Sequence, residues 1–168
     1  MARVSREYNK VDYSNRTVDL LLLKTILAVP VANKRMGIDV TNVSGEPMIV
    51  TGVEKMVQRF ANIFITAIGS SKFRQSYGTK VVPDVAKGLV YNMATLEAMA
   101  AGANLSARLQ VQAGDVNEDT PDDERLVNSE VVDLVFSREE AMVRISIKLT
   151  TAAGSSYTYI IPVAIGVH

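Results

Sequence analysis

The chain has 168 residues, 48% of them hydrophobic, which is enough for one buried core and too little for two separate domains. Eighteen Lys and Arg residues balance eighteen Asp and Glu residues, so no overall field attracts nucleic acid or an anionic membrane. The absence of cysteine excludes disulfides and thiolate metal sites, and the single histidine, His168, is the last residue, a poor place for a catalytic triad or a histidine metal cluster.

Residues 1–35 form a polar stretch followed by an apolar one. Residues 1–16 mix charges without any period, so we expect an arm that is ordered only when it docks on a partner. This stretch lacks the apolar region of a signal peptide, and the apolar block at 17–31 is too short to span a bilayer. The block suits a short helix or a mixed segment, in the core or at a subunit contact. We expect a protein that is made in the cytoplasm.

The stretch from Arg35 to Val50 alternates apolar and polar residues, which is typical of strands. Ile38 and Val40 alternate with polar neighbours, and residues 44–47 read Ser-Gly-Glu-Pro, a turn sequence. The pattern predicts a β-hairpin.

Residues 51–68 have the clearest helical pattern of the chain. Thr51 and Glu54 have the spacing of a capping box, and Gly69 is predicted to end the helix. The apolar side chains recur at helical spacing and should face the core: Val53, Met56, Val57, Phe60, Phe64, Ala67 and Ile68. The polar ones should face solvent: Glu54, Lys55, Gln58, Arg59, Asn62 and Thr66.

The loop at 70–82 interleaves basic and aromatic residues, namely Lys72, Phe73, Arg74, Tyr77 and Lys80. Such a loop can stack on bases and bind phosphates. Its aromatic residues can also fold back as anchors of a solvated loop, or the loop can dock on a protein.

The composition predicts a second long helix, from Tyr91 to Gln112. Its core-facing stripe is predicted to be Ala94, Met99, Leu105 and Leu109. The small residues Ala98, Ala101 and Gly102 would let another helix approach closely.

Six acidic residues lie between positions 114 and 125: Asp115, Glu118, Asp119, Asp122, Asp123 and Glu124. They lack the ligand order of an EF-hand, and their polar surroundings are not expected to bury a glycosidase acid. We predict a solvated acidic turn without a metal or a catalytic role.

The last third of the chain predicts a three-stranded β-meander, with clean alternation at Val143–Leu149 and a last strand at Tyr157–Ile165. Pro162 has no N–H, so this last strand is expected at the edge of the sheet, where another chain can add a strand. The predicted fold class is α+β: two main helices packed on a small, mostly antiparallel sheet that ends in a C-terminal β-meander, with an extended N-terminal arm.

The order of these features resembles the baseplate wedge and sheath-initiator family of contractile phage tails, a lysozyme-like baseplate protein family. Seven residues follow a stretch typical of that family: Gln58, Ile63, Phe64, Thr66, Gly69, Tyr77 and Gly78. Lys72 or Arg74 stands for the family's arginine, and Ser76 replaces its proline. Glu124-Arg125 looks like its Glu-Pro-Arg element without the proline.

The resemblance spans Asp39 to Ile165 and implies that residues 36–168 form one sheath-initiator-like domain of the virion tail baseplate. Baseplate wedge proteins would hold one face, and the strand edge would start assembly of the tail sheath protein, with the tail tube or hub as further neighbours. The expected partner-binding residues are Lys72, Phe73, Arg74, Tyr77, Glu124, Arg125, Tyr157, Tyr159 and Ile161. We expect no enzyme activity, cofactor, metal, nucleic acid or membrane. The alternatives are a cell-wall-degrading glycosidase of the tail and a nucleic-acid-binding module.

Overall fold

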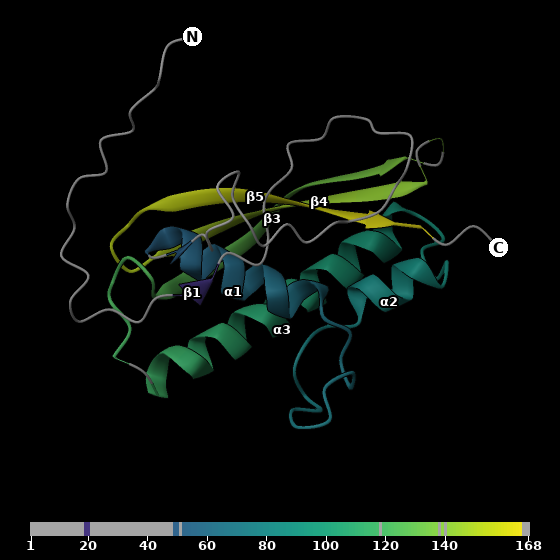
Figure 1. Ribbon diagram of the computed structural model, residues 1–168. Coiled ribbons are helices and arrows are strands. Elements are labelled where there is room, and N and C mark those ends of the chain that lie inside the picture. The colour runs from purple at the N-terminus through teal and green to yellow at the C-terminus, as the bar shows by residue number, and fades with distance from the viewer. Residues whose placement is uncertain are drawn as a thin grey trace, which may run out of the picture.

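The computed structural model describes residues 19–20, 49–50, 52–117, 119–137, 139 and 141–165. Its main elements are the helices α1 (Val53–Ile65), α2 (Val81–Ala86) and α3 (Met93–Asn117) and the strands β3 (Leu126–Ser137), β4 (Met142–Thr151) and β5 (Ser156–Ala164). The strands form an antiparallel sheet in the order β3-β4-β5, and the helices lie on one of its faces (Figure 1). This arrangement confirms the predicted α+β fold with its C-terminal meander.

Two further strands are very short. β1 (Asp19–Leu20) pairs antiparallel with β2 (Ile49–Val50). A strand was predicted at Ile49–Val50 and is present as β2; its partner within the described residues is β1, and the predicted first arm of the hairpin lies outside them. The apolar block was expected to form a short helix or a mixed segment, and its described residues, Asp19–Leu20, are extended and pair with β2, which fits a mixed segment and not a helix at this point. The rest of the apolar block, residues 35–48 and the N-terminal arm lie outside the described residues.

The core lies between α1 and the central strand β4. Met56, Phe60 and Phe64 of α1 are fully buried, and the rings of Phe60 and Phe64 stack with their centroids 6.0 Å apart. The alternate residues of β4 face them and are also fully buried: Val143, Ile145, Ile147 and Leu149. The predicted alternation of this strand is therefore confirmed.

The two ends of α1 differ from the prediction. The N-cap residue is Gly52, which has no side-chain cap, and Thr51 of the predicted capping box lies outside the described residues. The helix ends at Thr66, whose extended backbone breaks the helical path and whose hydroxyl donates to the carbonyl of Asn62 (2.6 Å). The predicted end at Gly69 was thus too late, and Ile68 is exposed instead of facing the core.

α3 faces the core with a different side from the one predicted. Its buried apolar residues are Leu96, Ala100, Ala103, Ala107 and Val111, while Ala94, Leu105 and Leu109 are exposed and Met99 is partly buried. Alanines fill the contact because they let α3 lie close to α1 and β3. Ala98, Ala101 and Gly102 are exposed and contact no described helix. Within the described residues, no helix combines the length and hydrophobicity needed to span a membrane.

Candidate assembly surfaces

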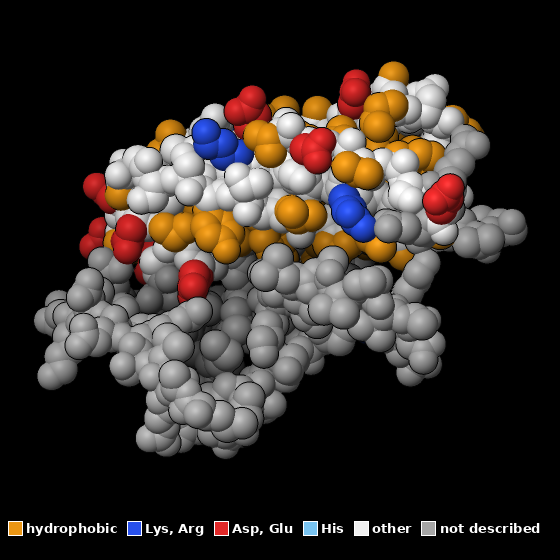
Figure 2. Space-filling model, turned by 90° about the horizontal axis from the view of Figure 1, so that it is seen from above, with side chains coloured by type: hydrophobic (Ala, Val, Ile, Leu, Met, Phe, Trp, Pro, Cys, Tyr) orange, Lys and Arg blue, Asp and Glu red, His pale blue; other side chains and the backbone are white. Residues whose placement is uncertain are grey.

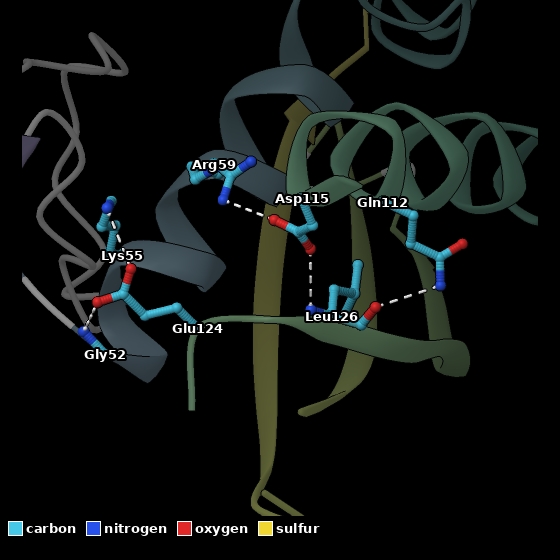
Figure 3. A network of polar contacts seen from close by, with 7 residues as sticks. All are labelled: Gly52, Lys55, Arg59, Gln112, Asp115, Glu124 and Leu126. Atoms are coloured by element: carbon cyan, nitrogen blue, oxygen red, sulfur yellow. Dashed lines mark hydrogen bonds and ion pairs between the residues drawn. The ribbon is translucent and has the colours of Figure 1, made fainter. Parts of the chain in front are cut away.

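A buried ion pair joins the start of α1 to the turn before β3 (Figure 3). Glu124 is only 1% exposed, and its Oε2 lies 3.0 Å from Nζ of Lys55. Its Oε1 accepts a hydrogen bond from the backbone N–H of Gly52 (3.0 Å). A carboxylate at a helix N-terminus also interacts favourably with the helix dipole. Glu124 therefore supplies, from a remote turn, the carboxylate that accepts from the N-cap N–H, a role that the predicted capping box gave to Glu54.

A second carboxylate joins α1, α3 and β3. Oδ1 of Asp115 accepts from Nη1 of Arg59 (2.8 Å), and Oδ2 accepts from the backbone N–H of Leu126 (3.2 Å). This network buries polar residues that were predicted to face solvent: Lys55 and Gln58 are both buried. The prediction failed because α3 and the acidic turn cover this side of α1.

The acidic turn is only partly solvated. Asp119 and Asp122 are exposed as predicted, whereas Asp115 and Glu124 are buried. A glycosidase acid must reach the sugar, but both carboxylate oxygens of Glu124 bind groups of this chain. The described residues also contain no group of three side chains placed to hold a metal ion. The network positions three distant segments of the chain relative to one another.

The basic-aromatic loop is ordered and carries one fully projecting ring. Inside the loop, the N–H of Gly69 donates to the carbonyl of Gln75 (3.0 Å). At its base, Gln110 of α3 accepts from the N–H of Gly78 and donates to its carbonyl, both at 3.0 Å. Phe73 is 97% exposed, so it does not fold back as an anchor. The hydrogen bonds of the loop thus hold Phe73 out into solvent.

The neighbours of Phe73 differ in exposure. Lys72 and Arg74 are exposed, whereas Tyr77 is partly buried against the core. Burial raises the pKa of the Tyr77 hydroxyl, and the nearby Arg74 and Arg59 partly offset that rise. Lys72, Phe73 and Arg74 therefore form the exposed tip, and Tyr77 supports it.

One edge of the sheet is closed by side chains of α3. Asn104 donates to the carbonyl of Ser129 (3.0 Å), and Gln112 donates to the carbonyls of Leu126 (3.2 Å) and Val127 (3.0 Å). Between them, Arg108 donates to Oδ1 of Asn128 (2.8 Å). These three α3 residues recur every four positions and cover β3, a role that the sequence interpretation missed although the spacing of polar residues signals it.

The other edge of the sheet is β5, which confirms the edge position predicted from Pro162. Tyr157, Tyr159 and Ile161 pair with Leu149, Ile147 and Ile145, so they lie on the helix-facing side. Their burial increases along the strand until Ile161 is buried. The side chains of Tyr159 and Ile161 thus contribute to the core, whereas Tyr157 is exposed.

The open face of the sheet carries the other set of β5 side chains. Figure 2 shows this face, with apolar side chains lying between acidic and basic ones. Ile160, Val132 and Val135 are exposed. Charges flank them, with Glu130 directly opposite Lys148.

The predicted partner-binding residues do not form one site. The loop tip projects from the helical side of the molecule, β5 lies in the sheet, and Arg125 follows α3 in the turn before β3 (Figure 1). Arg125 is exposed and its Nη2 lies 2.6 Å from Oδ1 of Asp122, whereas its neighbour Glu124 does not reach the surface. The structure therefore offers separate contact surfaces. A scan against protein-family profiles and a search of curated proteins both found no match.

Proposed function

We propose that this chain is a structural subunit of a contractile phage tail baseplate that starts tail sheath assembly by strand addition at β5. The observation that carries the proposal is the contrast between the two sheet edges. Side chains of α3 donate hydrogen bonds to backbone carbonyls of β3. In contrast, no described strand pairs with the outer side of β5. Unpaired backbone groups along an edge bind an added strand.

Pro162 indicates which backbone groups of β5 are available. The pairing of β5 with β4 runs through Pro162 without a shift in register, so this position needs no N–H toward β4. In an antiparallel strand alternate residues direct their backbone groups to the same side. The N–H groups of Thr158 and Ile160 therefore point away from β4. An added strand would pair with the stretch before Pro162.

The loop tip and Arg125 are suited to bind the baseplate wedge. The loop tip offers an aromatic ring between two cations, a combination common at the energetic centres of protein interfaces. Arg125 is exposed and holds one carboxylate, and its guanidinium has further N–H donors for a carboxylate of the wedge bundle. We assign these two surfaces to wedge binding and β5 to the sheath.

Thr158→Pro tests the role of β5. The substitution removes an outward N–H and should leave the pairing with β4 intact. We expect the variant to unfold at a denaturant concentration close to that of wild type, and to lose its ability to nucleate sheath rings from purified tail sheath protein, as seen by electron microscopy. Thr158→Ala is the matched control and should nucleate normally. Nucleation by a folded Thr158→Pro variant would overturn the proposal.

Arg125→Ala tests the wedge contact separately. Its side chain is exposed, so the fold should be unchanged while less wedge protein is retained in a pull-down. If the variant retains as much wedge protein as wild type, Arg125 is not part of the interface. The assignment of β5 to the sheath would not be affected.

A further inference from the structure

The outward side of α3 carries an exposed apolar stripe from Ala94 to Leu109. Its members are Ala94, Ala98, Ala101, Gly102, Leu105 and Leu109, and all are exposed. The stripe ends at Gln112, which lies in the same arc and donates to carbonyls of β3. At about 100° per residue they fall within an arc of roughly 100°, opposite the buried alanines. We call this set the outer stripe. None of its members is charged.

The outer stripe places two large, exposed apolar side chains on one side of the helix, next to a run of small residues. α3 has 25 residues and is therefore about 37 Å long. Leu105 is 48% exposed and Leu109 is 55% exposed, so each would bury substantial apolar area against a partner. Contiguous exposed apolar surfaces of this kind mark protein contacts.

The sizes of the side chains along the stripe indicate which partner fits. The N-terminal half of the stripe holds only alanine and glycine, and the C-terminal half holds Leu105 and Leu109. A second α3 packed antiparallel would set each large half against a small half. A parallel copy would oppose large to large and small to small, which leaves clashes and gaps.

The charges beside the stripe also fit an antiparallel pair of α3 helices. Glu97 and Arg108 lie on one flank, because their separation of three helical turns returns them to nearly the same direction. Their midpoint falls just after Gly102, between the small and the large half of the stripe. In an antiparallel pair centred there, Glu97 of each copy lies level with Arg108 of the other. Arg108 donates to Asn128 through Nη1 and has further donors for a carboxylate.

We infer that two copies of this chain associate through antiparallel packing of their α3 helices, with the crossing point near Gly102. Leu105 then packs against Ala101 of the second copy, and Leu109 against Ala98. Two Glu97–Arg108 pairs close the flank of the interface. This association does not depend on the proposed baseplate function, since it uses neither β5 nor the loop tip.

Sedimentation over a range of protein concentrations tests the association. The wild-type chain should form a dimer, and Leu105→Glu and Leu109→Glu should each raise its dissociation constant by about tenfold or more, because they place a carboxylate in the apolar contact. Val132→Glu is the matched control: Val132 is 48% exposed, as Leu105 is, but lies on the sheet. Circular dichroism should show that all three variants remain folded.

Single cysteines test the orientation, because the natural chain has none. In the antiparallel pair, Ala98→Cys mixed with Leu109→Cys should form an oxidised cross-linked dimer, and neither variant should cross-link with itself. Self-cross-linking of either variant would indicate a parallel pair and contradict the inference. A wild-type chain that stays monomeric, or a dimer broken only by Val132→Glu, would also overturn it.

Discussion

Nζ of Lys55 and Oε2 of Glu124 lie 3.0 Å apart, and both side chains are buried although they come from distant parts of the chain. Oε1 of Glu124 also accepts a hydrogen bond from the N–H of Gly52, the N-cap of α1. Glu124 thereby fixes the turn before β3 against the helix. A buried ion pair adds little net stability over an apolar pair of similar shape. Removal of the carboxylate is costly, because the Lys55 ammonium is then buried without this counter-charge.

Glu124→Gln should therefore lower the free energy of unfolding by about 3–5 kcal/mol, since Lys55 then lacks its carboxylate. Urea denaturation measures this loss. Lys55→Met combined with Glu124→Gln should recover most of it, because the buried charge is also gone. Arg125→Gln is the control, since it removes an exposed pair with Asp122 and should change the free energy by no more than about 1 kcal/mol. A loss of that small size for Glu124→Gln would show that the buried pair does not anchor the turn.

Gly78→Ala should destabilise the protein through a steric clash at the base of the loop. Gly78 has φ +104°, and a Cβ atom there would lie 2.4 Å from the carbonyl oxygen of Thr66. Gly88 also has a positive φ, +72°, but a Cβ there meets no atom within 4 Å. Gly88→Ala should thus cost about 1–2 kcal/mol, and Gly78→Ala at least about 2 kcal/mol more. Equal losses in denaturant unfolding would show that the loop base relaxes without strain.

Phe73→Ala should leave stability unchanged while it weakens binding to the wedge. A ring that is 97% exposed contributes almost nothing to the core. If it is an anchor of the interface, its loss should cost about 2 kcal/mol of binding free energy, measured by calorimetry with purified wedge protein. Tyr91→Ala serves as the control, because Tyr91 is exposed outside the loop. Equal affinities for Phe73→Ala and wild type would exclude the ring from the interface.

Tyr159 should make stability fall at alkaline pH. Burial, and secondarily the nearby Tyr157, raises the pKa of the Tyr159 hydroxyl above its ordinary value near 10. The folded state therefore holds this proton more tightly than the unfolded state. The stabilisation is complete below the unfolded pKa and is lost as the pH rises through the folded pKa. The free energy of unfolding of wild type minus that of Tyr159→Phe should thus decrease above about pH 10, and a constant difference would contradict this.

The features that the sequence predicted correctly depend on local patterns. The apolar spacing of Met56, Phe60 and Phe64 and the alternation of β4 each specify a buried face, and Pro162 specifies an edge. These signals act over a few residues, so they can be detected without tertiary information.

The incorrect predictions concern faces that only tertiary packing decides. α3 carries large apolar residues on its exposed side and alanines on its buried side, so residue size indicated the wrong face. Lys55 and Glu124 were assigned to solvent because each charge was considered without its partner. The hydrogen bonds from α3 to β3 join segments separated by a loop, and no local pattern pairs Asn104 with Ser129.

Hydrogen exchange at β5 tests the central claim most directly. The amides of Thr158 and Ile160 should exchange quickly in the free protein, since they point away from β4. Addition of purified tail sheath protein should slow their exchange, because an added strand would accept their hydrogen bonds. The amides of α2 provide the internal reference and should not change. If the sheath protein binds while Thr158 and Ile160 exchange as before, strand addition at β5 is contradicted.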